Sequence, residues 1–117
     1  MTTPWPLELR IRRADRVLDV DFDTDETYAI KVDLLRAMTP SAAERGHGGG
    51  SDGPLGIDFS GVGLTGAVLV GAYAVRLLFD DGHDSGLYTW TALYRIGRDQ
   101  VQLSEDYLRL LQPARSA

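Results

Sequence analysis

The sequence contains no cysteine, only two histidines (His47 and His83) and a single lysine, Lys31. Without cysteine, the chain cannot form disulfides, hold an iron–sulfur cluster through its own thiolates, use a thiol nucleophile or build a cysteine-based zinc site. Two histidines leave few ways to build a metal site or an acid–base pair. Most metal and acid–base mechanisms are therefore excluded before any motif is considered.

The sequence also lacks an excess of positive charge, a secretory signal and a membrane-length apolar segment. Its 12 basic and 17 acidic residues give a net charge of −5, which argues against nonspecific binding to nucleic acids or anionic membranes. The first residues contain no basic region followed by an apolar stretch. The longest uncharged run, residues 59–75, contains four glycines and is shorter than the roughly 20 residues of a membrane helix. We therefore expect a cytoplasmic protein.

What the sequence does contain is typical of one small folded domain, residues 1–117, of the α+β class. Hydrophobic residues make up 44% of the chain and charged residues 25%. Apolar and polar residues alternate in three segments near the start, which predicts strands over residues 7–12, 18–22 and 28–32. Because the connections are short, the strands should form an antiparallel meander with one solvated face.

Charged residues of opposite sign lie on the predicted solvated face. Arg10 and Arg12 belong to the first strand, and Asp19 and Asp21 belong to the second. Attraction across the strand pair favours this register by roughly 0.2–1 kcal/mol. The main interpretation is a solvated face with paired charges; the alternative is an acidic binding patch from Asp19 to Glu26.

The middle of the chain predicts helical turns and a flexible loop. Asp33 is expected to cap a short helix through Arg36 that Pro40 ends, and Ser41 with Glu44 forms a capping box for a further turn. Residues 46–56 contain six glycines and one proline and are expected to form a flexible glycine-rich loop.

The second half predicts a hairpin followed by two helices. Strands resume near Val62, with Tyr73, Val75, Leu77 and Phe79 on one face of a strand that ends at an Asp81-Gly82 turn. Thr89 is expected to cap a helix that Gly97 ends. Ser104 is expected to open a C-terminal helix over residues 104–112, with an apolar stripe of Tyr107, Leu108 and Leu111. The predicted fold is therefore a small, mainly antiparallel β-sheet domain with short helices.

One glycine motif resembles a nucleotide-binding fingerprint but has the wrong context. Gly61, Gly63 and Gly66 match the G-x-G-x-x-G pattern. A dinucleotide site needs a strand before the motif and a helix after it, whereas the residues after Gly66 are strand-like. Residues 46–56 likewise lack the Gly-Lys-Ser/Thr ending of a phosphate-binding loop. We interpret these glycines as loop and strand-start residues.

His83 and the aromatic residues around it are the remaining candidates for chemistry or binding. The neighbouring His83 and Asp84 lack the spacing of a two-histidine, one-carboxylate iron site. His83 is expected to be a turn residue, with ligand contact as the alternative. Trp5, Tyr88, Trp90 and Tyr94 are interpreted mainly as core residues, with a binding surface as the alternative.

Residues 71–90, followed by Leu93 and Tyr94, resemble the signature of the bacterial DUF971 family, also called the gamma-butyrobetaine hydroxylase-like N-terminal domain family. The similarity extends over about residues 5–98. It includes further matches at Trp5-Pro6, Leu9, Tyr28-Ala29-Ile30, Leu34-Leu35-Arg36, Pro40-Ser41-Ala42 and Gly46-His47-Gly48. The resemblance implies a small α+β accessory domain, because the catalytic jelly roll that follows it in carnitine-biosynthesis dioxygenases is a separate domain.

In those dioxygenases, the similar domain carries a structural zinc on three cysteines and a histidine. The resemblance places the cysteine positions at Thr39, Ser41 and Glu44 and the histidine at His83. Because threonine and serine hydroxyls are poor zinc ligands, we expect no structural zinc and no other cofactor. A weak metal site formed by Glu44, His47 and His83 is the alternative.

The main functional hypothesis is a noncatalytic module that docks on a protein partner. The resemblance links such domains to iron-dependent oxygenases and to an iron–sulfur carrier ATPase of plant chloroplasts. The candidate interaction surface consists of Asp81, His83, Asp84, Tyr88 and Trp90. Two alternatives remain. One is a small-molecule or metal site around His83, with Arg76, Asp81 and Asp84. The other is a self-associating scaffold that uses the C-terminal apolar stripe.

Overall fold

A computed structural model of the chain describes residues 4–39, 54–82 and 86–112. Several predictions about individual residues lie outside these ranges: the capping box of Ser41 and Glu44, most of the glycine-rich loop, and the candidate site residues His47, His83 and Asp84. The zinc positions Ser41, Glu44 and His83 lie outside them as well.

The first three strands form the predicted antiparallel meander. They are β1 (Pro6–Arg12), β2 (Val17–Phe22) and β3 (Thr27–Lys31), in the order β1-β2-β3. The alternating residues Leu18, Val20, Phe22 and Ile30 are buried, as their period predicts. Leu7 was expected on the same face but is exposed, because the register shifts between Pro6 and Glu8 and leaves Leu7 without a partner on β2.

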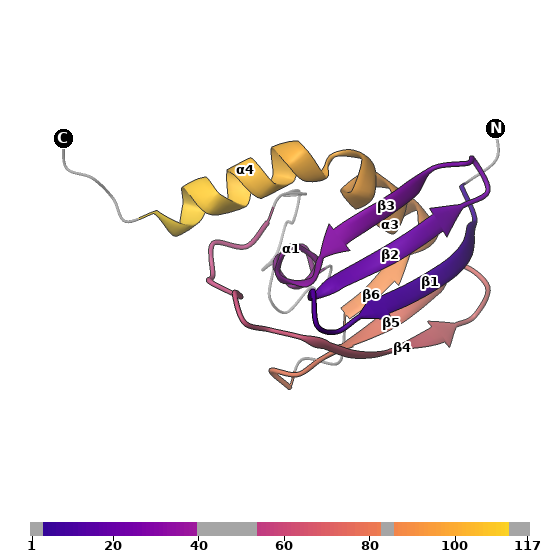
Figure 1. The fold of residues 1–117 in the computed structure, drawn as a ribbon, viewed down its shortest axis with the longest axis horizontal. Helices are drawn as coiled ribbons and strands as arrows, with labels where there is room; N and C mark the ends of the chain where they lie inside the picture. The colour runs from indigo at the N-terminus through magenta and orange to yellow at the C-terminus, as the bar shows by residue number, and fades with distance from the viewer. Residues whose placement is uncertain (1–3, 40–53, 83–85, 113–117) are drawn as a thin grey trace.

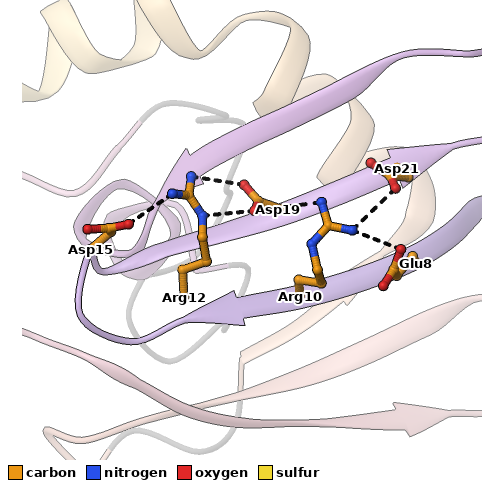
Figure 2. Close-up of polar contacts among 6 residues, drawn as sticks. All are labelled: Glu8, Arg10, Arg12, Asp15, Asp19 and Asp21. Atoms are coloured by element: carbon orange, nitrogen blue, oxygen red, sulfur yellow. Dashed lines mark hydrogen bonds and ion pairs between the residues drawn. The ribbon is translucent and has the colours of Figure 1, made fainter.

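The solvated face of this sheet carries the predicted pairs of opposite charge (Figure 2). Arg10 lies directly across from Asp19 in the register. Arg12 Nε lies 2.8 Å from an Asp19 carboxylate oxygen, and Arg10 also approaches Glu8 and Asp21. Since these aspartates are engaged in cross-strand pairs, the structure favours a register-fixing role for this face over an acidic binding patch.

The second sheet is also antiparallel and three-stranded. It contains β4 (Leu64–Val70), β5 (Ala74–Phe79) and β6 (Gly86–Thr89), in the order β4-β5-β6. Val75, Leu77 and Phe79 are buried as predicted. Tyr73 is not, because it lies in the turn before β5 rather than in the strand.

The glycine motif precedes and enters strand β4, as its context predicted, and no helix follows it. Gly63 N–H donates to Asp80 Oδ1 at 2.9 Å, and a Cβ at residue 63 would lie 2.7 Å from Asp80 Oδ2. Gly63 therefore allows a close approach between the start of β4 and the end of β5. It has no phosphate-binding geometry.

The described ranges contain three helices: α1 (Val32–Ala37), α3 (Trp90–Arg98) and α4 (Gln100–Leu111). The predicted cap of α3 is confirmed, since the Thr89 hydroxyl accepts a hydrogen bond from Ala92 N–H at 3.1 Å. Asp33 lies inside the first turn of α1 instead of capping it, and its carboxylate accepts from Leu34 N–H. None of the helices in the described ranges is long and apolar enough to cross a bilayer.

Two predicted helix boundaries are wrong. Gly97 does not end α3; it is buried within the helix, and a Cβ there would lie 2.7 Å from ring atoms of Tyr28. Its lack of a side chain allows α3 to pack against β3. Helix α4 begins at Gln100, before Ser104, because its first turns place Leu103 in the core.

The C-terminal stripe is only partly exposed. Tyr107 is buried and its hydroxyl accepts a hydrogen bond from Phe59 N–H at 2.7 Å, whereas Leu108 is exposed and Leu111 is partly buried. Both sheets and all three helices contribute to one hydrophobic core (Figure 1). In that view, α4 extends away from the two sheets.

Candidate functional site

An apolar groove runs between β1 of the first sheet and β4 of the second. It encloses about 590 Å³, which lies within the range of roughly 300–1,000 Å³ typical of ligand-binding clefts. Its lining combines residues of β1 and the residue before it, β4, the β4–β5 turn, β5 and the start of α3: Trp5, Pro6, Leu7, Glu8, Leu9, Ile11, Ala67, Leu69, Gly71, Ala72, Val75 and Trp90. We call this feature the β1–β4 groove.

The groove exists because the core between the two sheets is open along the β1–β4 side. Leu69 lies across from the buried Val75, so it belongs to the inner face of its sheet. Its side chain is nevertheless 68% exposed. On the opposite lip, Leu7 at the β1 bulge is 70% exposed. Large apolar side chains thus face solvent across a concave surface, a pattern that marks interaction sites.

Aromatic rings close one end of the groove. Trp5 packs edge-to-face on Tyr73 at 5.8 Å and on Trp90 at 6.2 Å between ring centroids. Trp90 is held by its indole N–H, which donates to Ala72 O at 2.9 Å. At the other end, Arg13 Nη2 donates to the backbone carbonyl of Thr65 at 2.8 Å. Trp5 and Trp90 line the groove, whereas Arg13 and Thr65 lie outside its lining, where their bond joins the end of β1 to the start of β4.

The backbone edges beside the groove are also distinctive. Within the described ranges, β1 pairs only with β2, and β4 pairs only with β5. Each strand therefore presents one edge without a neighbouring strand. Proteins usually protect such edges with charged residues or proline, but β4 contains neither.

Two residues of the sequence-predicted interaction surface belong to the core. Tyr88 is fully buried and donates its hydroxyl to the carbonyl of Leu35, and Trp90 is buried with its edge against the groove. Arg76, a candidate for the alternative small-molecule site, is exposed on the outer face of β5. The rings that suggested a surface therefore stabilise the fold, because they follow the inward-facing period of β6 and the first turn of α3.

Asp81, the third described residue of that surface, forms an ion pair with Arg36 of α1. Arg36 Nε donates to Asp81 Oδ2 at 2.9 Å, and the two side chains are 9% and 26% exposed. The guanidinium also lies 4.4 Å from the ring centroid of Phe59, a cation–π contact. Asp81 thus connects the β5–β6 turn to α1.

The zinc implied by the resemblance does not fit the residues at its positions. The family's cysteine positions carry Thr39, Ser41 and Glu44, and a threonine or serine hydroxyl does not ionise to a ligand as a thiol does. Thr39 is fully buried, and it is the one position of the set that lies in the described ranges. No group of three or more histidines, aspartates or glutamates is arranged to hold a metal within those ranges.

A carboxylate with three hydroxyl donors joins the β2–β3 turn to α3. Glu26 accepts hydrogen bonds from Tyr28 at 2.6 Å and from Thr24 and Tyr94 at 2.7 Å. These bonds, that of Tyr28 foremost, lower the pKa of Glu26 below its ordinary value. The bond to Glu26 and partial burial raise the pKa of Tyr28 to about 12. The cluster is structural and lies apart from the residues that line the groove.

The Glu26 cluster predicts a specific dependence of stability on pH. Because the folded state lowers the pKa of Glu26, its contribution is present above the ordinary value of 4.5 and is lost as pH falls through the folded pKa. Because the folded state raises the pKa of Tyr28 to about 12, that contribution is present below 10 and is lost as pH rises from 10 to about 12. Urea midpoints of the wild type and Glu26→Gln should therefore differ most between about pH 5 and 9. Curves that stay parallel below pH 5 would contradict this role for Glu26.

The groove was not predicted from the sequence. The available signal was the uncharged run through Val68, Leu69 and Val70, in which apolar residues occupy both faces of one strand. Such a run is also typical of a strand buried on both faces, so the sequence does not distinguish burial from an open groove.

Comparisons with known proteins agree with this fold. A family model described as gamma-butyrobetaine hydroxylase-like, N-terminal, matches residues 9–94. A protein solved by solution NMR is 40% identical, with a TM-score of 0.80 over 95% of this chain and 85% of that one. A second NMR structure is 34% identical, with a TM-score of 0.75 over 94% and 86% of the two chains.

A crystal structure of a protein of unknown function from Acidithiobacillus ferrooxidans, assigned to the DUF971 family, is also similar. It is 33% identical, with a TM-score of 0.64 over 79% of this chain and 91% of that one. None of the curated proteins compared matches the chain.

Proposed function

The chain belongs to the gamma-butyrobetaine hydroxylase-like N-terminal (DUF971) family, and from this premise we propose that it is a noncatalytic module that binds a protein partner through the β1–β4 groove. The observation that carries the proposal is the exposure of Leu7 and Leu69 across an apolar cleft. Fully burying an exposed leucine side chain contributes roughly 1.5–3 kcal/mol, so covering these two residues favours formation of a complex.

The chemistry of the lining supports binding over catalysis. Glu8 is the one ionisable lining residue, and its carboxylate pairs with Arg10 at 2.8 Å on the solvated face of β1. General acid–base catalysis needs a titratable group that faces the substrate, and the groove presents mainly aliphatic and aromatic surface.

The proposed type of protein partner is based on the family resemblance. Domain fusions in the family support an iron-dependent oxygenase or an iron–sulfur assembly factor as the partner. We also propose a cytoplasmic location, which cell fractionation can test.

A capture experiment tests the groove. The double variant Leu7→Asp/Leu69→Asp places two charges on the lips, and both sites are exposed, so the fold should tolerate them. Val101→Asp/Leu108→Asp is the matched control, since both residues are exposed apolar positions on α4. From native lysate, the wild type and the control should recover the same partner, and the groove variant should recover at least tenfold less. Equal recovery by the groove variant would overturn the proposal.

A small-molecule ligand is the second candidate, favoured by the volume of the groove. Ligand that binds the folded state raises the melting temperature, so a thermal-shift screen with 2-oxoglutarate, betaines, nucleotides and divalent metals distinguishes the two functions. A shift that Leu7→Asp/Leu69→Asp abolishes would favour this candidate. Of the alternative site around His83, His83 and Asp84 lie outside the described residues, and Arg76 and Asp81 are described above.

A further inference from the structure

We propose that the β1–β4 groove takes one extended segment of its partner as an added strand, with uncharged apolar side chains in the middle and a basic residue at the Trp5 end. This inference rests on the proposed function and specifies the chemistry of the partner. It follows from three properties of the groove: its backbone edges, its shape and its distribution of charge.

The backbone edges favour an extended occupant. The groove lies between β1 and β4, and each of these strands presents an edge with no neighbouring strand in the described ranges. An extended peptide can pair its N–H and C=O groups with such an edge and place alternate side chains in the apolar lining. The uncharged sequence of β4 favours that pairing beyond Thr65, whose carbonyl already accepts from Arg13, whereas β1 carries Pro6 and three charged residues. A helix, by contrast, has no backbone groups free to pair with a strand edge.

The shape of the groove argues against a second copy of this chain as the occupant. A two-fold interface brings the same patch of each subunit together. Here the patch is concave, with Leu7 and Leu69 as its lips and Leu9, Ile11 and Val75 deeper in its lining. Because a cleft cannot fill an identical cleft, a two-fold dimer through this face would leave the groove empty, and a narrow segment of a different protein fits it better.

The charged residues near the two ends of the groove favour a partner segment whose basic residue lies at the Trp5 end. At the Trp5 end, the carboxylate of the exposed Asp23 accepts a hydrogen bond from Trp5 N–H at 3.1 Å, beside the exposed ring of Tyr73. A lysine or arginine placed there gains both the carboxylate and an aromatic face. At the other end, Arg13 supplies positive charge against Thr65 O. The net charge of −5 also favours encounter with a basic segment.

A random heptapeptide library displayed on phage provides the probe, since β1 and β4 each contain 7 residues. The library is selected on the wild-type chain after counter-selection on Leu7→Asp/Leu69→Asp. Enriched peptides should alternate apolar and other residues, carry no charge in the middle and have lysine or arginine near one end. Enrichment of peptides with apolar residues at helical spacing, or no enrichment over the counter-selected variant, would overturn the inference.

Synthetic versions of the enriched peptide then test backbone pairing. N-methylation at three alternating residues removes the backbone N–H donors from one edge of the extended peptide. Two such peptides are made, one for each of the two alternating sets of residues. At least one of them should bind at least about tenfold more weakly than the parent peptide, by fluorescence anisotropy. Equal binding by both peptides would overturn the added strand while leaving the groove as a protein-binding site.

A charge reversal tests the orientation. Asp23→Lys should weaken binding of the basic peptide at least about threefold and strengthen binding of the same peptide with glutamate at its basic position. Failure of the partner-capture experiment would instead affect the proposed function, so the two results can be separated. Binding of a fluorescent fatty acid with no peptide enrichment would identify the groove as a lipid site and overturn both.

Discussion

Tyr88→Ala is expected to lower the free energy of unfolding by about 3–5 kcal/mol. The ring is 0% exposed, and its hydroxyl donates to the carbonyl of Leu35 on α1. The substitution removes a large buried aromatic side chain, leaves a cavity and deprives Leu35 O of a donor. Because a domain of this size has about 5–15 kcal/mol of stability in total, the urea midpoint followed by circular dichroism should fall markedly.

Tyr73→Ala is the matched control, because this tyrosine lies in the turn just before β5, near the same end of the β5–β6 pair as Tyr88, but is 68% exposed. It loses only the edge-to-face contact with Trp5, so its effect on stability should remain below about 1.5 kcal/mol. A Tyr88→Ala variant with the wild-type midpoint but weaker partner binding would contradict this prediction and assign Tyr88 to an interface, as the sequence suggested.

Asp81→Ala is expected to lower the free energy of unfolding by about 2–3 kcal/mol. Removing one partner of a buried ion pair costs roughly 3–5 kcal/mol, and the partial exposure of Asp81 reduces that value. Arg36 stays buried over Phe59 and loses a carboxylate bonded at 2.9 Å. The melting temperature and the urea midpoint should both fall.

Two further variants separate this loss from a general effect of removing an aspartate. Asp15→Ala removes the carboxylate of the exposed Arg12–Asp15 pair and should change stability by less than about 1 kcal/mol. The double variant Arg36→Met/Asp81→Ala removes both charges and should be more stable than Asp81→Ala alone. If Asp15→Ala and Asp81→Ala had equal effects, the Arg36–Asp81 pair would have no special role in attaching the β5–β6 turn to α1.

These expectations differ from the sequence-based view of the same residues. Asp81, Tyr88 and Trp90 were grouped as an interaction surface because polar and aromatic residues alternate near the hairpin turn. The structure places the two rings in the core and pairs Asp81 with Arg36, which lies 45 positions away in the sequence. Whether an aromatic ring is buried depends on which distant elements pack over it. The residues next to it in the sequence do not specify that packing.

Helix boundaries show the same difference between local and distant causes. The Thr89 cap was predicted correctly because a cap depends on a hydroxyl and a backbone N–H three residues apart. The end of α3 and the start of α4 were not, because Tyr28 packs against Gly97 and the core receives Leu103. Glycine often ends a helix, but it also occurs inside a helix where a neighbouring element packs closely. The sequence alone does not distinguish these two roles.

The sequence by itself determined the α+β class, the β1–β2–β3 meander, the cross-strand attraction of Arg10 and Arg12 to Asp19 and Asp21, and the family resemblance. Each of these depends on periodicity or on contacts between neighbouring strands joined by short turns. The absence of cysteine likewise excluded a cysteine-based zinc site.

Only the tertiary structure decided where the open apolar surface lies. Leu7 and Leu69 are 62 positions apart, and each occurs in a strand whose pattern is compatible with burial. Both line the β1–β4 groove and stay exposed, Leu7 because the bulge in β1 leaves it without a partner on β2 and Leu69 because nothing in the described ranges covers its sheet there. That exposure results from the packing of the whole domain, which no local pattern of residues specifies.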